Sequence, residues 1–504
     1  MSARRKLAVA TTSELAAAAA AEVADAGGNA VDCAVAAALV TMNTEPGVCA
    51  LAGGAYITIW PSGRDPLTID GGTAVPGLAA PDAADIAADS VRMDYGGGVE
   101  TIVGGASVAV PGSVAACDRA IQRYGNVSWA TVMAPSVRVT RDGFPLPAAC
   151  HHYLEYSGTP IFGRSQDGFN ALHDTSGRLR NAGNTITVAH LADSLAHIAK
   201  NGARDFYEGD LAACMVAHVS AGGGRLTAED LQRYEAIERP ALVAPFRGFD
   251  LALNPPPAIG GAMLAAMLGG LDRATELDRT TRLIRAQRDA MRFRLEHLDL
   301  AENVSDAITS LLRGVGVRPP APAERSSATV HTSAVDSTGL ACSVTSSAGY
   351  GSGEMPEGTG LWLNNCLGEL ELNRRGLDAG PPGARLPSNM TPGAARSADR
   401  IVAFGSPGAD RITTALQQFI FNYLDQEMSL DAANSAGRVH VELRGESYAV
   451  SAEAGVSLDA DVEVFRYPEH SMYFGGVGAA VFSAKDGPSA SADPRRVGGT
   501  FVTR

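Results

Sequence analysis

The segment RSSATVHTSAVD, residues 325–336, decides how the rest of the chain is interpreted. Its pattern predicts a loop that leads into a strand, with the hydroxyl group of Thr329 at the junction. Prolines at positions 319, 320 and 322 break any helix upstream, and Gly339 turns the chain downstream. Residues 340–347 then predict the partner strand. Taken alone, the segment is also typical of an ordinary surface hairpin.

The spacing of polar residues within this segment is more specific. It follows the pattern Thr-x-His-x-Ser-x-x-Asp and then a glycine turn, at Thr329, His331, Ser333, Asp336 and Gly339. This pattern resembles the start of the small subunit of gamma-glutamyltranspeptidases, members of the N-terminal-nucleophile hydrolase superfamily. The precursor in that family cuts itself before the threonine. The resemblance therefore implies cleavage between Ala328 and Thr329, with Thr329 as the nucleophile.

The chemistry of threonine explains why this position must become a chain terminus. A threonine hydroxyl is a poor nucleophile unless a base takes its proton. The free α-amine of the same residue can serve as that base, because its reference pKa is roughly 7.7 to 8.0. In an uncut chain the nitrogen of Thr329 belongs to an amide and cannot act as a base.

Composition narrows the range of partners. The 504 residues are enough for a large core, and length alone allows roughly two to four domains. With Lys+Arg 41 against Asp+Glu 55 the chain is acidic, so no nucleic-acid partner is expected. The seven cysteines show neither paired metal-ligand spacing nor a disulfide framework, which is typical of a protein in a reducing cytosol.

The N-terminal stretch is apolar but is interrupted by Glu14, Glu22 and Asp25, so it does not resemble a signal peptide. No run approaches about 20 apolar residues without a charge, and no membrane span is expected. We therefore expect a cytoplasmic protein. Thr12-Ser13 and the alanines that follow predict a capped helix over 13–26, and a second helix is predicted from 30 to about 41.

Three further stretches are interpreted from local patterns. His151 and His152 are adjacent, and in a strand their side chains point to opposite faces, so no metal site is expected there. The polar stretch 483–491 predicts a loop. The stretch SADPRR, residues 491–496, is another match to the family and is expected to have a structural role.

Other matches to the family imply residues that assist Thr329. Counting along the paired strands puts Ser347 where the family has a hydroxyl that orients and tunes the nucleophile's amine. The alternative for Ser347 is a serine on a polar strand face. The stretch GSPGAD, residues 405–410, precedes a predicted helix, and backbone N–H groups at such a turn suit an oxyanion. The resemblance implies Gly408 and Ala409 as these donors.

The substrate-binding motifs depart from the family. Family members have an arginine, which grips the α-carboxylate of a glutamyl substrate, at the position of Gly72. A family asparagine is missing near Gly349. Family residues that hold the substrate's amino group appear as Cys366 and Glu369, of which the glutamate can accept an ammonium and the thiol is a weak polar partner. Family donors to substrate carboxyl or carbonyl oxygens are matched by Ser388 and Asn389.

The resemblance covers nearly the whole chain, from about Ala8 to Arg496. It implies a four-layer αββα sandwich of the N-terminal-nucleophile hydrolase type, whereas periodicity alone predicts only a mixture of α and β. It also implies a zymogen that becomes a large segment, 1–328, and a small segment, 329–504, which together form one structural domain. The two segments would pair as a heterodimer, with a dimer of heterodimers left open.

The implied activity is hydrolysis or acyl transfer on a small-molecule acyl or amide substrate through an acyl-enzyme on Thr329, without a metal or organic cofactor. The changes at Gly72, Gly349 and Cys366 favour a non-glutamyl substrate in a biosynthetic or catabolic pathway, secondary metabolism included. Alternatives are a C–C bond hydrolase of the alkylproline-biosynthesis type, an oxamate-type amidohydrolase and an ordinary glutathione hydrolase. A binding protein that keeps the fold without catalysis is the alternative from another class.

Overall fold

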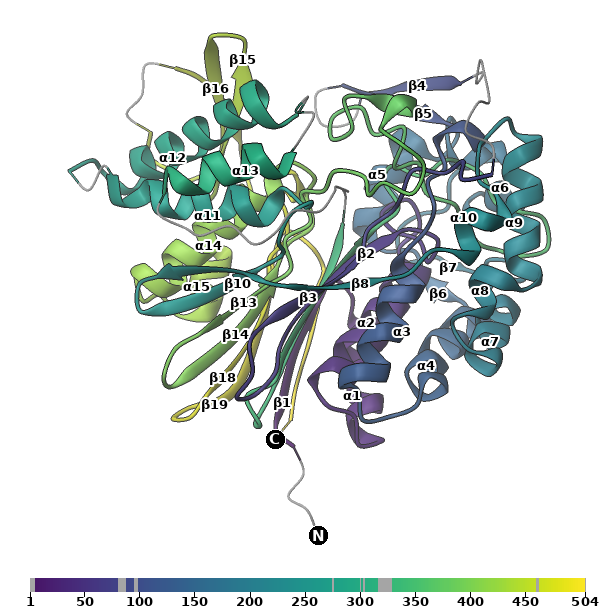
Figure 1. Ribbon diagram of the computed structural model, residues 1–504, viewed down its shortest axis with the longest axis horizontal. Helices are drawn as coiled ribbons and strands as arrows, with labels where there is room; N and C mark the ends of the chain where they lie inside the picture. Colours follow the sequence, from purple (N-terminus) through teal and green to yellow (C-terminus); the bar gives the residue numbers. More distant parts are fainter. Residues whose placement is uncertain are drawn as a thin grey trace.

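The computed structural model describes residues 5–79, 88–94, 98–273, 276–299, 301, 304–315, 329–458 and 462–503. Two antiparallel β-sheets form its centre and lie face to face, with helices on the outer side of each (Figure 1). The mixed α/β class predicted from the sequence is therefore confirmed. Ala328 lies outside the described residues.

The larger sheet has seven strands, and the hairpin predicted after Thr329 lies at its centre. Every residue of the two hairpin strands is buried, so the alternative of a surface hairpin is wrong. Each strand runs antiparallel to its neighbours. The order across the sheet is β20 (Gly499–Val502), β1 (Leu7–Thr11), β11 (Val330–Asp336), β12 (Ala341–Ser347), β2 (Gly54–Trp60), β3 (Leu67–Gly71) and β8 (Ile237–Pro240).

The second sheet has six strands, and its edge strand β19 corrects a sequence expectation. The polar stretch 483–491 was expected to be a loop, but most of it pairs with β18. An edge strand needs partners on one side alone, so its small serine and alanine residues are tolerated without apolar alternation. The order is β19 (Gly487–Ala492), β18 (Gly478–Ser483), β14 (Arg400–Gly405), β13 (Gly393–Arg396), β10 (Phe249–Leu253) and β9 (Leu242–Phe246).

Separate groups of helices cover the outer faces of the two sheets. Helix α2 lies directly on β11 and β12, and all of its side chains are buried because α1 and α4 cover its other side. The helices on the larger sheet are α1 (Glu14–Asp25), α2 (Ala30–Thr44), α3 (Ser113–Tyr124) and α4 (Trp129–Asp142). Those on the smaller sheet are α11 (Gly260–Gly270), α12 (Arg279–Phe293), α13 (Val304–Arg313), α14 (Arg411–Ile420) and α15 (Leu430–Ser435).

Smaller elements surround this framework. The additional helices are α5 (Ala148–Ser157), α6 (Gln166–Leu172), α7 (Leu191–Asn201), α8 (Asp205–Glu208), α9 (Asp210–Ala221) and α10 (Ala228–Gln232). The additional strands are β4 (Asp89–Met93) with β5 (Val99–Val103), β6 (Phe144–Pro145) with β7 (Thr185–Ile186), and β15 (Val439–Arg444) with β16 (Ser447–Glu453) and β17 (Glu463–Tyr467). Among the described residues, no helix combines the length and apolar character that a membrane crossing requires.

Three local expectations from the sequence are corrected. Helix α1 begins after Ser13, but this side chain makes no capping hydrogen bond, and the Thr12 hydroxyl donates to the Glu45 carboxylate instead. The second helix continues to Thr44, three residues beyond its predicted end. The adjacent histidines 151 and 152 lie in α5 and not in a strand. Helix α5 begins directly after Pro147, and a proline is well tolerated at the start of a helix.

His331 joins the two sheets. Its ring is so closely enclosed that a Cβ atom on Gly405 would lie 2.3 Å from Cε1. Nε2 lies 2.7 Å from the Ser333 hydroxyl and Nδ1 lies 2.8 Å from the Thr345 hydroxyl. Since Ser333 donates its proton to the carbonyl oxygen of Gly478, it accepts from Nε2–H, and Nδ1 accepts from Thr345. Burial lowers the pKa of His331 to about 3, so the ring is neutral.

This buried neutral histidine makes stability depend on pH. The pKa of His331 is about 3 in the folded chain and roughly 6.5 when unfolded, so its contribution is complete above pH 6.5 and is lost as pH falls towards 3. We expect the free energy of unfolding to lose up to roughly 1.4 kcal/mol per pH unit in that window from this group. Urea unfolding between pH 7 and 4 measures the slope. In His331→Gln, which cannot charge, the slope should be shallower, and equal slopes would contradict the assignment.

Candidate active site

Thr329 lies at the start of β11, on the wall of a small cavity of about 70 Å³. The residue is 6% exposed, and its Oγ1 atom is buried without a hydrogen-bond partner among the described residues. An unpartnered buried hydroxyl is uncommon, because such groups normally find a partner. The lining residues are Gly47, Val48, Tyr153, Thr329, Gly349, Tyr350, Gly408, Ala409, Arg411, Met472 and Arg496.

Ser347 lies beside Thr329 on the neighbouring strand. In the register of β11 and β12, Val330 is opposite Ser346, so one further step places Thr329 opposite Ser347. The Ser347 hydroxyl accepts a hydrogen bond of 2.8 Å from the backbone N–H of Gly349, which also lines the cavity. Ser347 is thus fully buried and held close to the threonine. Its role in orienting the amine stays a prediction.

The turn that contains Gly408 and Ala409 forms another part of the same cavity wall. It connects β14 to α14, and both residues have positive φ angles, 131° for Gly408 and 50° for Ala409. The Gly408 carbonyl oxygen accepts from the N–H of Arg411, 2.8 Å away, which closes the turn at the helix start. The two residues predicted as oxyanion donors are therefore brought to the cavity of Thr329.

The loop 475–476, which follows the 3-10 turn Met472–Phe474, packs against the turn that contains Gly408. A Cβ atom on Gly408 would lie 2.9 Å from the Cα atom of Gly475, so the two backbones touch. The next N–H, from Gly476, donates to the Ser406 hydroxyl at 3.0 Å. The path of residues 406–409 therefore depends on the position of the 475–476 loop.

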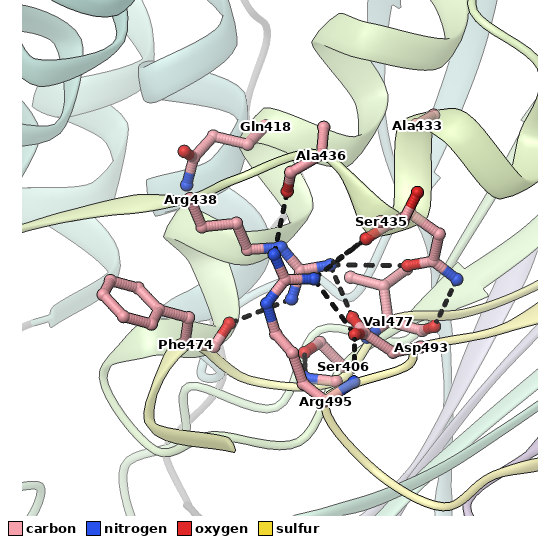
Figure 2. Close-up of polar contacts among 12 residues, drawn as sticks. Ser406, Gln418, Ala433, Ser435, Ala436, Arg438, Phe474, Val477, Asp493 and Arg495 are labelled. Atoms are coloured by element: carbon pink, nitrogen blue, oxygen red, sulfur yellow. Dashed lines mark hydrogen bonds and ion pairs between the residues drawn. The ribbon is translucent and has the colours of Figure 1, made fainter. Parts of the chain in front are cut away.

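Buried charges hold that loop in place (Figure 2). Arg438 and Arg495 share the carboxylate of Asp493, and Arg495 also pairs with Glu453. The side chains are 2% exposed for Arg438 and fully enclosed for the other three. Arg438 donates through Nη1 to the carbonyl oxygen of Phe474 at 3.0 Å. Breaking such a buried pair leaves an uncompensated charge, so the network fixes the loop. The expected structural role of the 491–496 stretch is realised by Arg495.

The position of the missing family arginine is closed to larger side chains. The backbone N–H of Gly72 donates to the Asp70 carboxylate at 2.9 Å, and its carbonyl oxygen accepts from Tyr234 and Arg385. A Cβ atom on Gly72 would lie 2.6 Å from the hydroxyl oxygen of Tyr56, which is itself buried. An arginine there would displace Tyr56, so Gly72 belongs to packed interior and does not line the cavity.

The other predicted substrate contacts also lie outside the cavity wall. Glu369 is buried directly behind Gly349, where a Cβ atom would meet its carboxylate at 2.9 Å. Cys366 packs in an apolar cluster, and burial raises the pKa of its thiol well above the ordinary value. Ser388 accepts from the N–H of Met390. The Asn389 amide donates to Asp410 at 2.6 Å.

Six lining residues that carry side chains were not among the predicted site residues: Val48, Tyr153, Tyr350, Arg411, Met472 and Arg496. Arg411 lies two residues after Ala409 in the sequence. This closeness to the predicted turn could have indicated that Arg411 lies at the cavity. Arg496 belongs to the 491–496 stretch, for which the sequence predicted a structural role and no place at the cavity. Among the described residues, no cluster of His, Cys, Asp and Glu side chains is arranged to hold a metal ion.

The turn geometry predicts that two substitutions in it differ in their effect on stability. Gly408→Ala should lower the free energy of unfolding by roughly 1–2 kcal/mol or more, because its φ of 131° disfavours a side chain and the new methyl group meets Gly475. Ala409→Gly should stay within about 1 kcal/mol of the wild type, because relief at a φ of 50° offsets the added chain entropy. Chemical denaturation compares the two variants. Equal losses would show that the turn does not have this geometry.

A model of the family described as Gamma-glutamyltranspeptidase matches residues 16–503. The chain is 27% identical to the glutathione hydrolase proenzyme of Pseudomonas sp. (strain A14), over 90% of this chain and 86% of the relative. It is 26% identical to the acylase ACY 1 proenzyme of Pseudomonas sp. (strain V22), over 98% and 93%.

Solved structures support the same fold. The cephalosporin acylase from Bacillus halodurans superimposes with a TM-score of 0.81 at 22% identity, covering 99% of this chain and 96% of that one. A likeness at this level of identity concerns the fold. The family match spans nearly the whole chain, including the segments that carry Thr329 and the Gly408 turn. The chain therefore belongs to the gamma-glutamyltranspeptidase family and is an enzyme of the N-terminal-nucleophile hydrolase type.

Proposed function

We propose that this protein is a self-processing threonine hydrolase that cleaves an amide-like bond of a small molecule through an acyl-enzyme on Thr329. One observation carries the proposal. The Thr329 hydroxyl is buried without a partner among the described residues, in a cavity that Gly408 and Ala409 also line. A nucleophile that faces backbone donors at a turn before a helix is the arrangement that acyl transfer needs.

The first reaction is the cut between residues 328 and 329. Oγ1 of Thr329 attacks the carbonyl carbon of Ala328, and the C–N bond breaks as the C–O bond of an ester forms. The proton of the hydroxyl passes to the departing nitrogen, which becomes the free α-amine. Water then hydrolyses the ester, which releases the carboxylate of Ala328 and restores the hydroxyl of Thr329.

Turnover uses the same hydroxyl with the new amine as its base. The amine takes the proton while Oγ1 attacks the acyl carbon of the substrate, and the N–H groups of Gly408 and Ala409 stabilise the oxyanion. The leaving amine receives the proton, and water or a second amine resolves the ester. Ser347, opposite Thr329 in the strand register, orients the α-amine in this scheme.

The two segments stay together after the cut in this proposal. Strands β11 and β12, from segment 329–504, lie between β1 and β2, from segment 1–328. Separation would break four rows of backbone hydrogen bonds, β20–β1, β1–β11 and β12–β2 in the larger sheet and β10–β13 in the smaller one. The expected product is therefore a heterodimer within one structural domain. We also infer that the helices outside the two facing sheets make this the four-layer αββα sandwich. The relatives' description as proenzymes supports the processing step.

A non-glutamyl substrate in a biosynthetic or catabolic pathway fits the local structure best. No arginine fits at Gly72 without displacing Tyr56, and the position of the missing family asparagine, Gly349, is closed by Glu369 and Asn365. Glutathione hydrolysis is the second candidate, because relatives at 27–28% identity carry that description. Release of p-nitroaniline from γ-glutamyl p-nitroanilide, at rates well above those for uncharged acyl anilides, would favour this second candidate.

Self-cleavage tests the proposal directly. Wild-type protein should separate on a denaturing gel into two pieces, and intact mass should show that the smaller piece begins at Thr329. Thr329→Ala should remain a single 504-residue chain, because the attacking oxygen is gone. Thr329→Ser keeps a hydroxyl and should still be cut.

A wild-type chain that stays uncut under maturation conditions would overturn this proposal, because the threonine would then have no free amine. Equal cleavage of the wild type and Thr329→Ala would also overturn it. Retained ligand binding by an uncut chain would instead favour a binding protein that keeps the fold.

A further inference from the structure

The loop that follows β12 forms part of the cavity wall around Thr329, through Gly349 and Tyr350. It also supplies the N–H that holds Ser347, from Gly349 at 2.8 Å. Gly349 and Gly351 flank Tyr350 and have positive φ angles of 67° and 84°, in a region that glycine adopts without steric cost. Because glycine imposes little on the backbone, contacts from outside the loop are needed to fix its position.

Tyr153 of α5 makes such a contact, and it comes from the other segment of the chain. Its hydroxyl donates to the carbonyl oxygen of Tyr350 at 2.9 Å. The sulfur atom of Met93 lies farther from this hydroxyl, at 3.9 Å, and is a weak acceptor, so the hydroxyl hydrogen is directed to Tyr350. The rings of the two tyrosines are also stacked, with centroids 6.3 Å apart and planes 26° apart.

Both tyrosines are themselves held in place. A Cβ atom on Gly47 would lie 2.9 Å from Cδ1 of Tyr153, so this buried ring packs directly on the backbone of the cavity wall. The Tyr350 hydroxyl donates to the carboxylate of Glu371 at 2.7 Å. Tyr350 is thus fixed at its carbonyl group by segment 1–328 and at its hydroxyl group by segment 329–504.

We propose that Tyr153 is a positioning residue for the α-amine of Thr329, an inference that rests on the proposed hydrolase function. By holding the carbonyl group of Tyr350, it fixes the neighbouring N–H of Gly349, which in turn directs the Ser347 hydroxyl. That hydroxyl accepts from Gly349, and its own hydrogen has no acceptor within the described part of the chain. The hydrogen is available to the lone pair of the neutral amine, which favours the form that acts as a base.

Loss of the Tyr153 hydroxyl should raise the pKa of this amine. Tyr153→Phe keeps the stacked ring but releases the carbonyl group of Tyr350, so the Ser347 hydroxyl stabilises the neutral amine less well. We expect the midpoint of the pH–rate profile to rise by roughly 0.5 to 1 pH unit, the effect of one hydrogen bond. Well below the midpoint the rate should fall about three- to tenfold, because fewer amines are neutral, and at high pH the rates should converge.

Methanesulfonyl fluoride measures this midpoint without a natural substrate. Oγ1 of Thr329 attacks the sulfur atom, the S–F bond breaks as the O–S bond forms, the amine takes the hydroxyl proton, and fluoride leaves. Intact mass of the small segment follows the modification at each pH, and uncut Thr329→Ala gives the background. Mild alkali eliminates methanesulfonate from the threonine oxygen but leaves a sulfonamide of the amine intact, which identifies the modified atom.

Other ionisable groups near the cavity are shared by the wild type and the variants. The two arginines keep their charge at every pH used, and burial raises the pKa of Tyr350 well above its ordinary value. Burial also raises the pKa of Glu45 to about 7, so Glu45 titrates in the same range as the amine. The difference between midpoints therefore carries the test. The groups that line the cavity or interact with a lining residue are Glu45, Tyr153, Tyr350, Glu369, Glu371, Arg411 and Arg496.

Two further variants separate positioning from packing. Tyr153→Leu also removes the stacked ring and should shift the midpoint at least as far as Tyr153→Phe. Tyr234→Phe is the matched control, because Tyr234 is a buried tyrosine of the same segment whose hydroxyl donates to the carbonyl oxygen of Gly72, away from this cavity. It should leave the midpoint unchanged. Tyr153→Phe should still cut itself, since the amine exists only after the cut.

The outcomes distinguish this inference from the hydrolase function. Urea unfolding of each variant shows how much stability is lost. Lower stability of Tyr153→Phe and Tyr234→Phe with an unchanged midpoint in both would overturn the positioning role, because Tyr153 would then only pack. A wild type that is cut and modified with the same midpoint as Tyr153→Phe would also overturn it and leave the hydrolase standing. A wild type that is neither cut nor modified would overturn the hydrolase, and the role of Tyr153 with it.

Discussion

The pairing of β11 with β1 on one side and with β12 on the other is the constraint on which the structure depends. A strand whose residues are all buried must satisfy every backbone N–H and C=O group through its neighbours. That requirement fixes the register and places Thr329 opposite Ser347 at the end of the hairpin. The same strand turns His331 against Gly405 and Gly478 of the second sheet, so a single element locates the hydroxyl and ties the central layers together.

The candidate site is assembled from both sheets. Thr329 belongs to the larger sheet, while Gly408 and Ala409 follow a strand of the smaller one. The distance between Thr329 and the Gly408 turn is therefore set by how the sheets stack. Buried charges around Arg495 fix the loop that touches Gly408, so the rigidity of the turn is provided from outside the cavity.

Much of this arrangement could be predicted from the sequence, for identifiable reasons. The hairpin carries alternating branched residues and a glycine turn, and the family match indicated that Thr329, Gly408 and Ala409 belong together. Local sequence patterns did not predict the features that depend on contacts with distant segments of the chain. The 483–491 stretch becomes a strand because it lies beside β18, and no residue within it signals that neighbour. Arg496 faces the cavity only because distant segments fold around it, which no local motif encodes.

The interleaving of β1, β11, β12 and β2 has a consequence for how the protein is made. Either segment, produced without the other, would present long, buried-type strands with open edges, and such edges recruit other chains and promote aggregation. The uncut chain brings all four strands together in one unimolecular step. If the proposed cut between residues 328 and 329 takes place, reassembly after denaturation becomes bimolecular and depends on protein concentration, so covalent continuity matters most during the first folding event.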